Sequence, residues 1–139
     1  MKEYTQIMAV DPTFQYALML KRSNPPGQGL LSGVGGSVEE GETPGECAAR
    51  EWLEETTLPL EAPLVHLLTI FHNDCINHIF GVKLPKADIY FSRNFEEGSL
   101  GWRHILGMGL NNGQNKQVAW DGLIPYTLNL MREGGAFAA

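Results

Sequence analysis

The chain has 139 residues and a mass of 15.4 kDa, with 43% apolar and 19% charged residues. This length suits one domain with a core of its own, and the composition argues against a disordered chain. The formal net charge of −6 argues against a surface that binds nucleic acid polymers. We therefore expect a single domain that covers residues 1–139.

The expected cellular location follows from three sequence patterns that the chain lacks: a disulfide framework, a secretory signal and a membrane span. The two cysteines, Cys47 and Cys75, form no C-x-x-C pair, which favours two reduced thiols over a disulfide framework. The first residues have no secretory signal pattern, and no stretch approaches the roughly 20 apolar residues of a membrane span. We expect a cytoplasmic protein without membrane contact.

The first elements in chain order form a predicted β-hairpin. Glu3–Val10 and Phe14–Arg22 are rich in apolar, β-branched and aromatic residues, and an Asp-Pro-Thr turn separates them. A loop is predicted at Ser23–Gly29, which holds two prolines and two glycines. The segment Leu30–Val38 follows, in which three glycines permit close approach of the backbone.

The clearest predicted element is a helix over Pro44–Thr56. Thr43 can be its N-cap, Pro44 takes the first helical position, and Glu46 completes a T-x-x-E capping box. The Leu-Pro pair at positions 58 and 59 is expected to end the helix. One flank of this helix is apolar and the other is almost wholly acidic.

The second half of the chain shows weaker patterns. A turn at Asn73-Asp74 separates two predicted strands, and a Gly/Asn-rich stretch precedes a predicted helix in which Pro125 marks a kink or a late start. The predicted elements are strands at Val65–Phe71, His78–Lys83 and Leu100–Ile105, an irregular stretch at Lys86–Glu97, and a helix at Lys116–Met131.

Acidic residues gather in one part of the chain. Within residues 39–55 lie seven of the sixteen, opposed only by Arg50: Glu39, Glu40, Glu42, Glu46, Glu51, Glu54 and Glu55. Three of them, Glu51, Glu54 and Glu55, stand at i, i+3 and i+4, so their carboxylates share one sector of the helix and repel one another. Either a hard divalent cation binds them or they form a solvated acidic face. Spacing alone leaves both interpretations open.

A longer pattern favours the cation. Gly36-(five residues)-Glu42-(seven residues)-Arg50-Glu51-Trp52-Leu53-Glu54-Glu55 closely resembles the Nudix box, G-x5-E-x7-R-E-U-x-E-E-x-G-U, in which U is bulky and apolar. Every charged position matches. The chain departs from the pattern at Thr57, where the family has glycine. Since a β-branched residue is poorly suited to positive φ, we expect the helix to end there in another conformation.

The resemblance implies a fold, a cofactor and a set of site residues. The fold would be the α/β/α sandwich of Nudix proteins, with a mixed sheet. In the family, helix carboxylates and a backbone carbonyl hold Mg²⁺, or Mn²⁺, which implies Glu51, Glu54, Glu55 and the Gly35 carbonyl as ligands. Glu51 is the first candidate for the general base and Glu54 the second. Arg50 would position the glutamates, and Glu42 would be its structural partner.

Other residues are weaker candidates. Members often recruit a further acid from a downstream loop; Glu97, with Glu96 as its alternative, fits this role, although a solvated loop acid explains either residue as well. Arg22 is a candidate for substrate phosphate, or part of a surface pair with Lys21. Trp120, with Asp121 beside it, is a candidate for stacking on a nucleobase, but packing is the simpler interpretation. The four histidines show no H-x-H or H-E-x-x-H spacing, so the sequence does not predict a zinc site.

We expect a pyrophosphohydrolase of a nucleoside diphosphate derivative. Sequence markers of other Nudix subclasses are missing, which leaves a nucleoside triphosphate, or a modified one, as the leading substrate, with monophosphate and pyrophosphate as products. Two alternatives stay open: a non-catalytic Nudix module that senses a nucleotide or protein, and a hydrolase of ADP-ribose or another nucleotide sugar. The assembly state is also open, with a homodimer among the alternatives.

Overall fold

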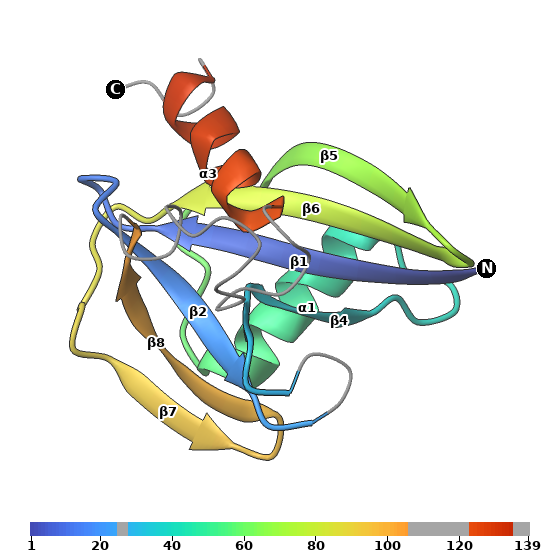
Figure 1. Ribbon diagram of the computed structural model, residues 1–139, viewed down its shortest axis with the longest axis horizontal. Helices are drawn as coiled ribbons and strands as arrows, with labels where there is room; N and C mark the ends of the chain where they lie inside the picture. The colour runs from blue at the N-terminus through green and yellow to red at the C-terminus, as the bar shows by residue number, and fades with distance from the viewer. Residues whose placement is uncertain (25–27, 106–122, 135–139) are drawn as a thin grey trace.

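The computed structural model describes residues 1–24, 28–105 and 123–134. Its elements are β1 (Lys2–Val10), β2 (Tyr16–Arg22), β3 (Leu31–Ser32), β4 (Val34–Ser37), α1 (Pro44–Thr56), β5 (Val65–His72), β6 (Cys75–Lys83), β7 (Ser92–Phe95), β8 (Gly98–His104) and α3 (Leu123–Glu133). Figure 1 shows α1 behind the sheet and α3 in front of it. This layering, with a mixed sheet, confirms the α/β fold implied by the resemblance. Among the described residues, no helix is long and apolar enough to cross a membrane.

The described strands form one sheet of eight, which positions the site. The main order is β5-β6-β1-β2-β8-β7, and β1 and β6 are parallel while the other pairs are antiparallel. The strands β1 and β2 pair only at Ala9 with Leu18 and Val10 with Ala17, so they diverge beyond that point. β4 pairs with the first half of β1 instead. The Gly35-Gly36 segment therefore lies against β1, in contact with α1.

The core is divided between the two faces of the sheet. Along β1, Ile7 and Ala9 pack on the α1 side, where Trp52 is 1% exposed, while Met8 and Val10 pack on the α3 side. Successive side chains of a strand point to opposite faces, so an unbroken apolar run fits a strand that is covered on both. Trp52 anchors α1 to the sheet and thereby sets which helix flank faces outward.

Most of the predicted elements are confirmed, with shifted ends. The hairpin is present, but Phe14 has φ 59° and belongs to the turn. Strand β6 begins at Cys75, earlier than predicted, and β8 begins at Gly98. Within α3, Pro125 lies in the first turn, where backbone N–H groups have no partner inside the helix. The N–H that proline lacks therefore costs no helical hydrogen bond, which supports a late start of the helix. The predicted residues 116–122 lie outside the described part.

The prediction of an irregular stretch at Lys86–Glu97 is wrong in part. Ser92–Phe95 forms β7, which pairs with β8 through a tight turn at Glu96-Glu97. This strand is short and lies at the edge of the sheet, and its alternating side chains are polar or only half-buried, so it has little of the apolar signal that identifies a strand in sequence.

Candidate active site

The first turn of α1 is capped as predicted. The Thr43 hydroxyl accepts the Glu46 N–H at 3.1 Å, and the Glu46 carboxylate accepts the Thr43 N–H at 2.9 Å. These two bonds satisfy backbone donors that the helix itself leaves unpaired. The helix covers Pro44–Thr56, as predicted, so the spacing argument for its glutamates holds in three dimensions.

The last turn of α1 corrects a prediction. Thr57 adopts the left-handed conformation, with φ 61° and ψ 10°, and its N–H donates to the Leu53 carbonyl at 3.0 Å. The helix thus ends in the conformation that glycine would favour, although the residue is β-branched. The Thr56 hydroxyl accepts the Leu58 N–H at 3.0 Å and so holds the chain immediately after the turn.

Arg50 joins several of the acidic residues. Its guanidinium donates to both carboxylate oxygens of Glu42, at 2.7 and 3.1 Å, and to Glu51 at 3.0 Å and Glu54 at 3.3 Å. The hydrogen bonds from Arg50 lower the pKa of Glu42 to about 2, with help from the Glu39 N–H. Arg50 is therefore held at the loop–helix junction by Glu42 and by the Ser37 carbonyl, which accepts from Nη2 at 3.1 Å, and its Nη1 faces the helix carboxylates.

Glu51 lies beneath the glycine of the box. Its side chain is 13% exposed, and a Cβ added to Gly36 would overlap its carboxylate. Burial raises the pKa of Glu51, and Arg50 partly opposes that shift. The requirement for glycine at position 36 therefore follows from packing: any side chain there would displace the carboxylate.

Glu55 is the most enclosed carboxylate. It is 3% exposed; one oxygen accepts the Gly35 N–H at 3.0 Å, while the other, Oε2, has no hydrogen-bond partner. Burial, together with the charges of Glu97 and Glu51, raises the pKa of Glu55 to about 8. A buried carboxylate with an unpaired oxygen is costly unless a proton or a cation compensates it.

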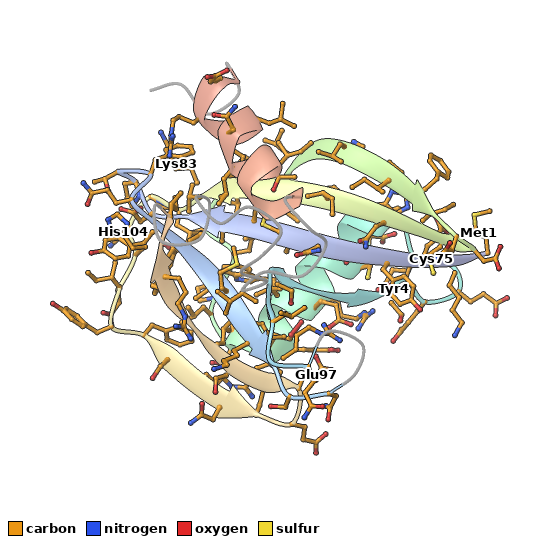
Figure 2. All side chains as sticks on the ribbon, in the orientation of Figure 1. Met1, Tyr4, Cys75, Lys83, Glu97 and His104 are labelled. Carbon is orange, nitrogen blue, oxygen red and sulfur yellow. The ribbon has the colours of Figure 1, made fainter. Side chains whose placement is uncertain are left out.

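The structure brings Glu97 to the same site. Its charge acts on both Glu55 and Glu51, and Figure 2 shows it at the turn between β7 and β8, near the end of β2. Glycine is required at position 98, where φ is 151°, because a Cβ there would overlap the Lys21 carbonyl. The Ser23 N–H donates to the Glu97 carbonyl at 2.9 Å, which fixes the turn. Its neighbour, the alternative acid Glu96, offers its carbonyl to Asn24 at 3.2 Å.

The remaining candidates differ in how far the structure places them. Arg22 ends β2 opposite Gly98, one residue from Glu97, so it lies at the same edge of the site. Trp120 and Asp121 lie outside the described residues. Trp102 is partly buried and packs against the apolar cluster on the α1 side.

Arg93 is a residue that sequence reasoning missed. From β7 it donates to the Glu55 carbonyl at 2.7 Å, and its guanidinium lies 4.7 Å from the Phe95 ring centroid. The backbone and the side chain of Glu55 are thus both fixed, by Arg93 and Gly35 respectively. The Glu-Glu-Gly turn after Phe95 is a hairpin signal that could have identified β7, and with it the position of Arg93.

The donor set fits a hard divalent cation. The candidate ligands are all oxygen atoms, and the unpaired Oε2 of Glu55 lies close to the carboxylates of Glu51 and Glu97. Within the described ranges, no three His, Cys, Asp or Glu side chains already stand at metal-binding spacing. Glu54 is turned toward Arg50 and is 58% exposed, so its side chain has room to rotate toward an ion.

Comparison with known proteins identifies the family and supports the fold. Residues 6–97 match the NUDIX domain family model. The fold is similar to a MutT protein from Methanosarcina mazei Go1, with a TM-score of 0.69, 18% identity and 95% of each chain covered. It is also similar to the Bacillus subtilis pyrophosphohydrolase BsRppH, with a TM-score of 0.70, 19% identity, and 99% of this chain and 85% of that chain covered.

A third similar structure is the NUDIX domain of Shewanella oneidensis NrtR in complex with ADP ribose. The TM-score is 0.60 at 17% identity, over 76% of this chain and 73% of that chain. At such identities the three structures establish a shared fold. The family model covers well over half of the chain and includes the acidic helix, so the chain belongs to the Nudix family of hydrolases.

Proposed function

We propose that this protein is a Mg²⁺-dependent pyrophosphohydrolase that acts on a nucleoside triphosphate or a modified nucleoside triphosphate. Nudix hydrolases generally use divalent metal ions. The observation that carries the proposal is the buried Glu55 carboxylate, whose Oε2 is unpaired beside Glu51 and Glu97. A cation would compensate this concentration of negative charge, and the same cation would attract a polyphosphate.

The proposed ligands are Glu51, Glu54, Glu55, Glu97 and the Gly35 carbonyl, and Mn²⁺ could replace Mg²⁺. When bound, the ion would neutralise phosphate charge and lower the pKa of a water molecule. Protein side chains would position the ligands and bind the substrate. Arg50 would hold Glu51 and Glu54 in place, and Arg22, at the edge of the site, would contact a substrate phosphate.

Glu51 is the proposed general base. It is enclosed under Gly36 and hydrogen-bonded by Arg50, whereas Glu54 is largely exposed, so Glu51 is the better-positioned acceptor. Water would attack one phosphorus of the pyrophosphate linkage, and its proton would pass to the carboxylate. The bridging P–O bond would break, which releases a nucleoside monophosphate and pyrophosphate.

The similar structures support a substrate that contains a phosphoanhydride bond, but they do not distinguish one such substrate from another. One is named a pyrophosphohydrolase and another was solved with ADP ribose, which also contains a pyrophosphate linkage. The preference for a triphosphate over ADP-ribose rests on the subclass markers that the sequence lacks.

A substrate panel with and without Mg²⁺ tests the proposal. Ordinary, oxidised and methylated nucleoside triphosphates should be compared with ADP-ribose, coenzyme A and a dinucleoside polyphosphate. We expect the highest kcat/KM for a triphosphate and no turnover in a chelator. A clear preference for ADP-ribose would contradict the substrate class but retain the hydrolase. Tight nucleotide binding without turnover in Mg²⁺ would favour the sensor alternative.

A further inference from the structure

A row of polar side chains crosses three neighbouring strands, and none of its members belongs to the carboxylate site just described. Glu3 lies on β1, His78 on the adjacent β6, and Thr69 and His66 on the edge strand β5. His78 Nε2 lies 2.8 Å from Glu3 Oε1, and His78 Nδ1 lies 3.3 Å from the Thr69 hydroxyl. The same hydroxyl lies 2.8 Å from His66 Nε2. Two imidazole nitrogens therefore converge on one oxygen.

The Glu3 carboxylate determines which nitrogen of His78 is available. An ionised carboxylate only accepts hydrogen bonds, so the proton of a neutral His78 ring lies on Nε2. Its Nδ1 then carries a lone pair directed toward Thr69. A carboxylate on the far nitrogen of a histidine is the arrangement that orients metal-binding histidines and increases their basicity.

The second histidine is both accessible and partly restrained. His66 is exposed, and its ring packs edge-on against Phe80 with centroids 5.4 Å apart. The His66 and His78 ring centroids are 6.3 Å apart, so a small rotation of the exposed ring brings both nitrogens within reach of one ion. The side chain of His78 is 14% exposed, which leaves it in contact with solvent.

We propose that His66 and His78 form a binding site for a borderline transition-metal ion such as Zn²⁺, beside the Thr69 hydroxyl and with Glu3 orienting His78. Imidazole nitrogen suits such ions, whereas the carboxylates around Glu55 suit hard ions such as Mg²⁺. In the part of the chain that the structure describes, no third His, Cys, Asp or Glu completes a shell, so water would fill the other positions. The site would be exchangeable, and an ion in it would join edge strand β5 to β6.

Zn²⁺ titration in a saturating excess of Mg²⁺ tests the proposal, because Mg²⁺ occupies the oxygen ligands of the other site. We expect one Zn²⁺ per chain by calorimetry, a higher melting temperature, and shifts in the ring resonances of His66 and His78. His66→Ala and His78→Ala should each abolish these effects. Glu3→Gln should weaken binding by about 10- to 100-fold, since it removes the charge that orients His78.

Two controls keep the outcome unambiguous. Figure 2 places His104 at the opposite end of the sheet from Tyr4, which follows Glu3 in the chain, and from Cys75, which begins the strand of His78, so His104→Ala should bind Zn²⁺ normally. Glu54→Gln should also bind Zn²⁺ normally. His66→Gln, at an exposed position, should lose Zn²⁺ binding but keep the melting temperature of the metal-free protein, which separates a loss of binding from unfolding. Unchanged binding in the His66 and His78 variants, loss of binding in Glu54→Gln, or no binding at all would overturn the proposal.

Discussion

The Glu55 carboxylate is tied to Gly35 by a 3.0 Å hydrogen bond, and its second oxygen, Oε2, is buried without a partner. Each of these features has a consequence for the protonation of Glu55. The bond favours the charged form, whereas burial and the charges of Glu97 and Glu51 disfavour it more strongly, so its pKa rises from 4.5 to about 8. A carboxyl whose pKa is raised by folding stabilises the folded state while it stays protonated.

The metal-free protein should therefore lose stability as pH rises from about 4.5 towards 8, the interval between the unfolded and folded pKa of Glu55. Melting temperatures over this range, in a chelator, measure the loss. Mg²⁺ should reduce it at the alkaline end, because a cation then compensates the ionised carboxylate. Glu55→Gln, which cannot ionise, should show a flatter pH profile in the chelator. An identical profile for the variant and the original protein would contradict this account.

Glu54→Gln is expected to lower activity without lowering stability. The change keeps size and helix propensity but removes a charged oxygen ligand, so activity should fall by at least ~10²-fold. Without metal, the free energy of unfolding should hold steady or rise, since repulsion among the helix glutamates decreases more than is lost with an exposed ion pair to Arg50. Glu51→Gln should reduce activity to at least the same extent.

The matched control for Glu54→Gln is Glu40→Gln, at an exposed position of the loop before α1. Its kcat/KM should stay close to that of the original protein. Near-normal hydrolysis by Glu54→Gln, combined with a large loss of stability, would mean that the glutamate is structural.

Gly36→Ala tests the space that holds Glu51. The new Cβ would overlap the Glu51 carboxylate, which is the mobile end of a side chain, so the fold should tolerate the change while the carboxylate moves. We expect a fall in kcat and in apparent Mg²⁺ affinity with a small change in melting temperature. Gly45→Ala is the control, because a Cβ there meets nothing within 4 Å and improves helix propensity. Equal activity of the two variants would exclude the proposed crowding.

Thr57→Gly should stabilise the protein. Thr57 is exposed and has φ 61°, a conformation that costs a β-branched residue energy but suits glycine. Glycine also increases the chain entropy of the unfolded state, which offsets part of this gain. We expect a net increase of about 0.5 to 1 kcal/mol in the free energy of unfolding, measured by denaturant titration. Thr57→Ala removes the hydroxyl but keeps the strain, so it should show no gain. An equal gain in both variants would assign the effect to the hydroxyl.

The local parts of the site were predictable from sequence because short-range physics determines them. The Thr43–Glu46 capping box, the helix between Pro44 and Thr56 and the single acidic flank all follow from residues within a few positions of one another. The box pattern then predicted Glu42 as the partner of Arg50, which the 2.7 Å hydrogen bond confirms. The strand β1 was also predictable, because its second half, Ile7–Val10, is an unbroken apolar run of the kind that burial on both faces produces.

Tertiary structure alone decided which distant residues meet. Only the β7–β8 turn brings Glu97 to Glu55, and only the edge strand β7 delivers Arg93 to the Glu55 carbonyl. The approach of His66 to His78 depends in the same way on the register of β5 against β6, with its irregularity after His66. The spacing of residues along the chain does not predict such contacts, because strand register is set by packing across the whole sheet. Thr57 is a further case. Its intrinsic preference for negative φ is overridden because the helix before it and the chain after it are both held in place.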